Sequence, residues 1–177
     1  MSYDGASFSN VHSNTNWYAE NLPAAWVDAG KRDVLRARAR DLERNSDVMN
    51  AIVGAFKRNV YGAGFRLRST VESEELREEI ERAWEIWCKK ENCDVTGTQS
   101  FDSLMRMAIR RKKVDGGILI LKTHTAGGFL PFKLQALEVD VLDETAVAHG
   151  NNKVIGGIEY DIYNKAVGYH IKQFAPD

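Results

Sequence analysis

The sequence predicts an α+β fold, with amphipathic helices in the first two thirds packed on antiparallel strands and hairpins of the last third. In the first two thirds, apolar residues recur every three or four positions, which is the helical period. Beyond the Asp-Gly-Gly at residues 115–117 the pattern changes to short apolar or alternating runs separated by glycine and asparagine, which is typical of strands. Helices and strands segregated along the chain favour α+β over alternating βαβ units.

The composition predicts a globular chain with one core. Of 177 residues, 44% are hydrophobic and 28% charged, which is typical of soluble proteins. No apolar run approaches the roughly 20 residues that span a bilayer, and the N-terminus lacks the layout of a secretory signal. We therefore expect no membrane association and a cytoplasmic setting. We expect residues 1–30, rich in Ser and Asn, to form a mobile arm that docks through Trp17 and Trp26, and residues 31–177 to form a single domain.

The first two long helices are predicted on either side of Ser46. Asp33 begins the first helix, Ser46 has the side chain to cap the second, and Gly62 and Gly64 end the second. The second helix has apolar residues at helical spacing, which predict one buried face. This predicted face consists of Val48, Ile52, Ala55, Phe56 and Val60.

Two further helices are predicted to begin after Ser73 and Ser100. Glutamates follow Ser73, which suits the positive end of a helix dipole. The apolar residues of both helices fall on one side and predict buried faces. The inward residues are Leu76, Ile80, Ala83, Trp84, Trp87 and Cys88 in the first of these helices, and Phe101, Leu104, Met105 and Ala108 in the second.

The strands are predicted from period and turn residues. Residues 65–68 alternate basic and apolar side chains and indicate a short strand. The continuous apolar run at residues 118–121 favours a central strand covered on both faces, and a glycine turn leads into a partner at residues 132–137. In a last hairpin, Ile158, Tyr160 and Ile162 alternate with outward acidic residues before a turn at residues 164–165.

The chain shows few signs of an active site. It has no Gly-rich phosphate loop and no zinc-type spacing of cysteine or histidine, so we expect no catalysis, metal or cofactor. A strand-face histidine such as His170 is expected to be solvated. The acidic residues of the last third could converge on one side of the sheet to hold a divalent cation for phosphodiester hydrolysis, although polar strand ends are the simpler interpretation. These residues are Glu138, Asp140, Asp143, Glu144, Glu159 and Asp161.

Charge is distributed unevenly along the chain. Residues 31–68 carry ten basic and four acidic residues, a balance of +6, whereas residues 72–94 carry nine acidic and four basic residues, a balance of −5. Arg36, Arg40 and Arg44 repeat every four residues and form one stripe on a helix. Such a stripe can contact phosphate, or it can pair with acidic residues such as those at 72–81 of its own or a neighbouring subunit.

No aromatic residue is interleaved with these arginines, so any nucleic-acid contact is expected to be with the backbone and without sequence specificity. The candidate residues for contact with a subunit or with DNA are Arg36, Arg38, Arg40, Arg44, Lys57, Arg58, Arg66 and Arg68.

Several segments, in order, resemble the lambda-type portal proteins of tailed phages. The first is Arg-Ala-Arg-Ala-Arg-Asp-Leu-Glu-Arg-Asn at residues 36–45, followed by Arg-Asn-Val-Tyr-Gly-Ala-Gly-Phe at residues 58–65. Further similar segments lie at residues 84–87, 94–97, 100–101, 110–117, 134–143, 157–161 and 167–171. The chain departs from the family pattern at residues 164–166, where Gly-Arg-Pro is common, and at residues 46–47, where proline is common.

The resemblance implies a structural, non-enzymatic subunit of a homo-oligomeric ring, typically of twelve copies, at the portal vertex of the virion. DNA passes through such a ring during packaging and ejection, the ring joins head to tail, and capsid and terminase proteins are its partners. Assembly is expected in the cytoplasm of the bacterial host. Because portal subunits are several hundred residues long, we expect this chain to be an N-terminal fragment that covers part of the wing. The alternative function is a stand-alone nucleic-acid-binding module without sequence specificity.

Overall fold

The computed structural model describes residues 21–28 and 30–172. Most of the predicted arm, with Trp17, lies outside the described residues. Trp26 lies in the short helix α2 (Ala24–Val27) and leaves 69% of its surface exposed, so it is not docked against the described part of the chain. No helix within these ranges combines the length and the apolar composition that crossing a membrane requires.

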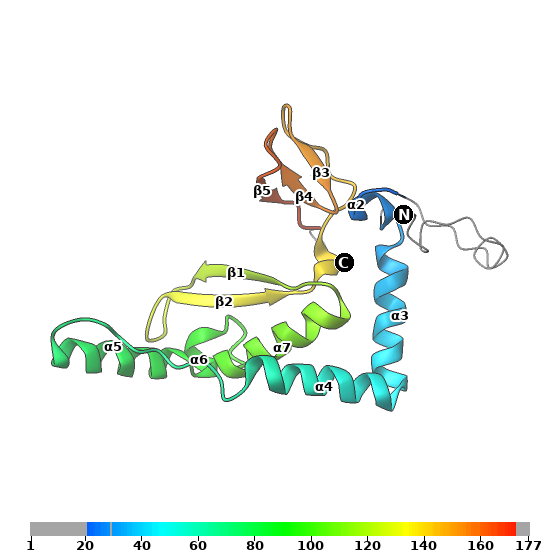
Figure 1. Cartoon of the computed structure of the whole chain (residues 1–177). Helices are drawn as coiled ribbons and strands as arrows, with labels where there is room; N and C mark the ends of the chain where they lie inside the picture. The colour runs from blue at the N-terminus through cyan, green and yellow to red at the C-terminus, as the bar shows by residue number, and fades with distance from the viewer. Residues whose placement is uncertain (1–20, 29, 173–177) are drawn as a thin grey trace, which may run out of the picture.

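Two long helices meet at a corner. α3 (Arg32–Asn45) and α4 (Asp47–Tyr61) are separated by Ser46 alone, whose extended backbone interrupts the helical path. The Ser46 side chain accepts a hydrogen bond from the Met49 N–H and so satisfies a free donor of the first turn of α4. In Figure 1, α3 stands upright at one end of α4. The boundary predicted at Ser46 is confirmed.

The face of α4 that the chain covers differs from the predicted one. α4 packs on α7 (Phe101–Val114) and α3, and it buries Val53 and Tyr61 there. Val48, Ile52 and Val60, which were expected to be buried, leave 68%, 55% and 55% of their surfaces exposed. Apolar residues form two neighbouring stripes on this helix, and the packing partner covers only one of them.

The other helices complete a lower layer. α5 (Glu74–Trp87) and α7 are capped by Ser73 and Ser100, each of which accepts a hydrogen bond from a backbone N–H three residues on, as predicted. α6 (Lys90–Cys93) follows α5 directly. The first turns of α5 extend away from the body of the molecule (Figure 1), so Leu76 is exposed although Trp87 is buried.

The predicted hairpin after α7 is present but is not central. β1 (Leu119–His124) and β2 (Phe132–Leu137) pair antiparallel, with Leu119 opposite Leu137. They form a two-stranded sheet, and side chains of β1 alternate between half-buried and exposed, so the expectation of a strand covered on both faces is wrong. Residues 65–68 form no strand either, because no described segment pairs with them in a ladder.

The hydrophobic core lies between α5, α6, α7 and β2. Its buried members are Trp87, Cys93, Leu104 and Leu134. The Trp87 indole N–H donates a hydrogen bond of 2.9 Å to the carbonyl of Phe132, and the two rings stack with centroids 5.6 Å apart. The burial predicted for Trp87 and Leu104 is therefore confirmed.

A second, small sheet follows the 3₁₀ turn η2 (Val139–Val141). Its antiparallel strands are β3 (Lys153–Ile155), β4 (Ile158–Tyr160) and β5 (Ala166–Tyr169), in that order. It stands apart from the β1–β2 hairpin, beside α2 (Figure 1). The predicted last hairpin is confirmed. The prediction that its acidic residues face outward and its apolar residues inward is wrong, because Glu159 is buried and Ile162 is exposed.

Candidate functional site

The arginine stripe of α3 lies against the acidic end of α7 and η2. Arg40 Nε is 2.7 Å from Asp115 Oδ1, and Arg40 Nη2 is 2.5 Å from Asp140 Oδ2 and 3.7 Å from Glu138 Oε2. Arg36, one turn earlier, pairs with Asp33 of its own helix and lies 3.6 Å from Asp140. Two of the three stripe arginines therefore bind carboxylates within the chain.

Asp115 is the buried centre of this network. Its side chain is 1% exposed, and it also lies 3.2 Å from Arg111 Nη1 of α7. Burial by itself would raise the pKa of the neighbouring Asp140, but the hydrogen bond from Arg40 and the charges of Arg36 and Arg40 lower it overall. The hydrogen bonds from Arg40 to Asp115 and Asp140 raise the pKa of Arg40 further above its usual range. Arg40 and Asp140 therefore stay charged at neutral pH, and the hydrogen bonds of Arg40 join α3 to the end of α7 and to η2.

A second ion pair strengthens the junction between α3 and α7. Arg110 Nε of α7 lies 2.5 Å from Oε1 of Glu43, which is buried on α3. The hydrogen bond to Glu43 raises the pKa of Arg110. Neither Glu43 nor Asp115 was singled out from the sequence, since an acidic residue in a charged helix looks solvated until the packing of that helix is known.

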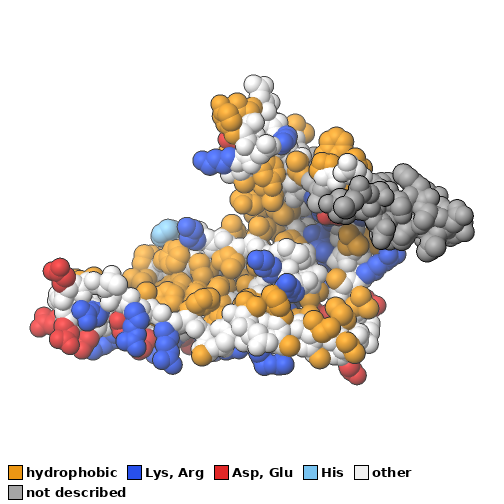
Figure 2. Space-filling model, in the orientation of Figure 1, with side chains coloured by type: hydrophobic (Ala, Val, Ile, Leu, Met, Phe, Trp, Pro, Cys, Tyr) orange, Lys and Arg blue, Asp and Glu red, His pale blue; other side chains and the backbone are white. Residues whose placement is uncertain are grey.

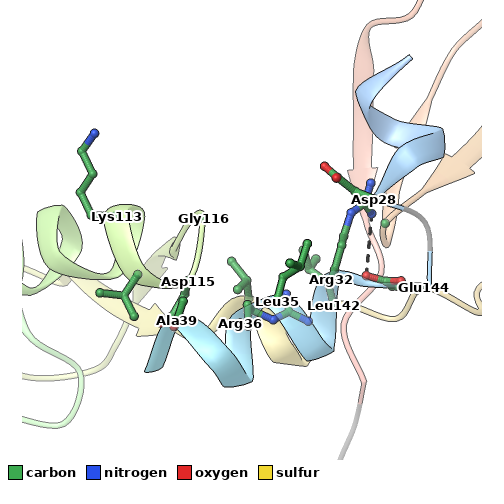
Figure 3. Close-up of a pocket in the computed structure, with 13 residues that line it drawn as sticks. Asp28, Arg32, Leu35, Arg36, Ala39, Lys113, Asp115, Gly116, Leu142 and Glu144 are labelled. Carbon is green, nitrogen blue, oxygen red and sulfur yellow. Dashed lines mark ion pairs between the residues drawn. The ribbon is translucent and has the colours of Figure 1, made fainter. Parts of the chain in front are cut away.

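An open cleft of about 490 Å³ lies beside the arginine network. α3 forms one wall with Leu35, Arg36 and Ala39, and the end of α7 with the segment from η2 to β3 forms the other (Figure 3). The ion pair between Arg32 and Glu144, at 3.8 Å, crosses its rim. The described lining residues comprise apolar, acidic and basic side chains, without a serine, cysteine or histidine nucleophile.

The remaining basic candidates lie on the surface. Arg38, Arg44, Arg58, Arg66 and Arg68 are exposed, and Lys57 is half-buried. Within residues 21–28 and 30–172, none of these six side chains forms an ion pair. Their contact with a subunit or with DNA stays a prediction.

The arginine helix α3 and the acidic first turns of α5 lie far apart in the folded chain, although residues 65–68 of the basic segment lie beside α5. The acidic first turns of α5 lie at the opposite end of the molecule from α3 (Figure 1), and Figure 2 shows Asp and Glu side chains gathered there. The described ion pairs of α3 involve Asp33, Glu43, Asp115, Glu138, Asp140 and Glu144, and none involves α5. Among the described residues, Arg36 and Arg40 of the stripe therefore pair with acids of their own chain that lie outside residues 72–81.

The acidic residues of the last third do not converge on one site. Glu138 and Asp140 face Arg40, and Glu144 faces Arg32. The other three carboxylates lie elsewhere: Asp143 caps the turn at Thr145, Asp161 caps the β4–β5 turn, and Glu159 contacts His149 and His170. The described structure gives no support to a shared cation site for hydrolysis.

Comparison with known proteins agrees with the resemblance seen in the sequence. Residues 12–177 match the family model described as phage portal protein, lambda family. The chain belongs to the lambda family of phage portal proteins. It is also 31% identical, over 154 residues, to a "Probable portal protein" of Halomonas phage phiHAP-1. That match covers 81% of this chain and 30% of the relative, so the chain spans less than a third of the length of this portal relative. In this member of the portal family, the arginine segment joins three elements of the chain to one another.

Proposed function

We propose that this chain is a structural part of the wing of a phage portal subunit. In the complete protein, a ring of typically twelve subunits conducts DNA into the procapsid and out of it, and joins head to tail. The observation that carries the proposal is the match of residues 12–177 to the lambda family of portal proteins. The proposed partners are capsid and terminase proteins. The proposed location is the portal vertex of the virion, after assembly in the host cytoplasm. No catalysis is assigned to this segment.

The uncovered face of α4 supports a place in a ring. A closed ring of identical subunits needs two different faces that fit each other. Val48, Ile52 and Val60 form an apolar row on the side of α4 that the chain leaves open, and Val34 and Leu42 are exposed on α3 beyond the corner. Figure 2 shows hydrophobic side chains gathered over this corner. Contact with a neighbouring subunit would remove this apolar surface from water, at about 25 cal/mol per Å².

Charge supplies a second, complementary feature. The projecting end of α5 exposes Glu74, Glu75 and Glu78, while Arg38 and Arg44 on α3 are exposed and form no ion pair among the described residues. Because the two groups lie at opposite ends of the molecule (Figure 1), they can meet between neighbours in a head-to-tail ring. We assign this contact to the interface that closes the ring.

The apolar face is tested in the full-length protein. Ile52→Asp is expected to abolish the ring, measured as native mass, because it places a charge in the apolar contact. The matched control is Ile162→Asp, which changes an exposed residue of the β4–β5 turn. The native mass of this variant should remain that of the ring. Normal rings in Ile52→Asp would remove the α4 face from the interface.

The charged contact is tested by charge exchange. Reversing Arg38 and Arg44 to Glu, or Glu74, Glu75 and Glu78 to Lys, should each weaken ring formation, and combining the two sets should restore it. Arg36 and Arg40 are left unchanged, since their loss would disturb the fold itself. Failure of the combined variant to recover would contradict the contact.

The nucleic-acid-binding alternative is tested by affinity for duplex DNA across a salt series. A steep fall in affinity with salt, lost when Arg38 and Arg44 are reversed, would favour that alternative, because phosphate contacts release counterions. The proposed ring contact predicts no such binding by residues 1–177.

A further inference from the structure

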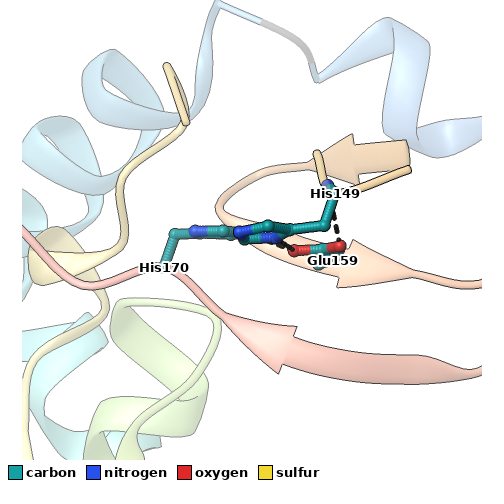
Figure 4. Close-up of side chains that lie close together, drawn as sticks. All are labelled: His149, Glu159 and His170. Carbon is teal, nitrogen blue, oxygen red and sulfur yellow. Dashed lines mark hydrogen bonds and ion pairs between the residues drawn. The ribbon is translucent and has the colours of Figure 1, made fainter. Parts of the chain in front are cut away.

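Two histidines and a glutamate meet in the small sheet. His149 precedes β3, Glu159 lies in the middle of β4, and His170 directly follows β5. Glu159 Oε2 is 2.9 Å from His149 Nδ1 and 2.7 Å from His170 Nε2. Figure 4 shows both rings directed at this carboxylate, and the three candidate ligand atoms lie within 4.8 Å of one another.

The carboxylate is buried and fixed from its other side. Glu159 is 4% exposed, and its Oε1 accepts hydrogen bonds from the His149 N–H at 3.0 Å and from Asn152 Nδ2 at 2.7 Å. These two hydrogen bonds fix the orientation of the carboxylate, so that Oε2 is directed at the two imidazole rings, as a metal-binding carboxylate requires.

The small sheet has a polar centre where a hydrophobic one is usual. Between residues 142 and 172, Glu159 has a buried side chain, whereas every apolar side chain is at least partly exposed. Ile162 and Tyr163 in the β4–β5 turn and Val167 in β5 are exposed. Strands of three and four residues with so little apolar burial gain little from the hydrophobic effect, and small units of this kind are commonly stabilised by a metal ion.

We propose that His149, Glu159 and His170 form a binding site for a divalent transition-metal ion, with Zn²⁺ as the best fit. Two imidazole nitrogens and one carboxylate oxygen are a ligand set that Zn²⁺ takes, whereas Mg²⁺ and Ca²⁺ prefer oxygen ligands alone. The ion replaces the hydrogen bonds between the rings and Glu159. Zinc binds a ring nitrogen that carries no proton, so in the occupied site the proton of each imidazole would reside on the other nitrogen, His149 Nε2 and His170 Nδ1.

The geometry requires only a small adjustment. In a tetrahedral zinc site the ligand atoms stand about 3.3 Å apart, given bonds of about 2.0 Å. The present separations of 2.7 and 2.9 Å must therefore widen by a few tenths of an ångström, and the two ring nitrogens, which lie within 4.8 Å of each other, must reach the same spacing. The side chain of His149 is 81% exposed and free to move outward, while that of His170 is 21% exposed. The exposed side also gives a fourth ligand, such as water, access to the ion.

The role of this ion is structural and independent of the portal function. It would join the loop before β3, the centre of β4 and the end of β5, and so hold the three strands together. His170 also bonds through its backbone to Gly157 and Asp143, at 2.8 Å in both cases, so the site would fix the attachment of the sheet to the segment after η2.

The test is titration of the chelator-treated protein with ZnCl₂, followed by calorimetry and thermal unfolding, with MgCl₂ as the control cation. We expect one Zn²⁺ per chain, a higher Tm with Zn²⁺ and no change with Mg²⁺, because an ion that binds only the folded state stabilises it. An absence of Zn²⁺ binding, or an equal effect of Mg²⁺, would overturn the proposal.

Variants locate the site. His149→Gln, Glu159→Gln and His170→Gln should each weaken Zn²⁺ binding at least about tenfold, since even outer partners of metal ligands are worth roughly 10–100-fold in affinity. His124→Gln, which removes an exposed histidine at the end of β1, should bind Zn²⁺ as the parent does. If Glu159→Gln or His170→Gln fails to fold, the exposed His149 still decides the question. Unchanged binding by His149→Gln would place the ion elsewhere.

Discussion

Replacing Arg40 by Met tests whether the arginine segment holds the fold together. Arg40 is the residue of α3 that contacts both the end of α7 and η2, through Asp115 at 2.7 Å and Asp140 at 2.5 Å. Methionine keeps the length and the helix propensity of the side chain but removes its charge and its donors. The variant therefore leaves the buried carboxylate of Asp115 with Arg111 alone, at 3.2 Å.

The expected loss of stability follows from the burial of Asp115. Removing one partner of a buried ion pair costs about 3–5 kcal/mol, because the other charge is left without compensation. The remaining contact with Arg111 and the partial exposure of Arg40, at 23% of its side chain, reduce this to about 2–3 kcal/mol. For a chain of this size each kcal/mol lowers Tm by about 2–4 °C, so a fall of roughly 5–10 °C is expected.

Urea unfolding followed by tryptophan fluorescence measures the change. Arg38→Met is the matched control, since Arg38 is exposed on the same helix, and its effect should stay within about 0.5 kcal/mol. Combining Arg40→Met with Asp115→Asn should cost clearly less than the sum of the single changes, because the unpaired charge is gone. A loss below about 0.5 kcal/mol in Arg40→Met, or strict additivity in the pair, would refute the argument.

Two further predictions concern a turn and a buried acid. Gly157→Ala is expected to lower the free energy of unfolding by about 1–3 kcal/mol, because Gly157 has φ of +77° and an added Cβ would lie 2.8 Å from Cβ of Leu142. Gly150→Ala is the control that isolates the effect of this contact, since Gly150 has φ of +56° but open space around it. Equal losses of stability in the two variants would contradict the prediction. Asp94 accepts hydrogen bonds from Thr96, Thr98 and Gln99, which outweigh the effect of burial and lower its pKa. Its contribution to stability is present above the unfolded-state pKa of about 4 and is lost as the pH falls through the lower pKa of the folded state. Asp94→Asn should therefore flatten this acid limb when unfolding is measured from pH 7 to pH 2. An unchanged limb would count against the prediction.

Local sequence determined where most elements begin and end. Ser46, Ser73 and Ser100 each cap a helix at the predicted position, because a serine side chain can satisfy a free backbone donor whatever the helix packs against. The glycine turn at residues 127–128 and the turn at residues 164–165 were also predicted from local sequence, because the backbone conformation of a tight turn depends on the residues in it. The α+β order and the portal family likewise followed from patterns along the chain.

Only the tertiary structure decided which faces and charges meet. On α4, the apolar row that contains Ile52 and the one that contains Val53 both fit the helical period. Contact with α7 decides that the side of Val53 is buried. Arg40 reaches an acid 75 residues away, and Glu159 on β4 contacts two histidines that lie 10 and 11 residues away, before β3 and after β5. Side-chain period and charge balance are properties of one segment, whereas pairing depends on the distance between segments, which the sequence by itself does not specify.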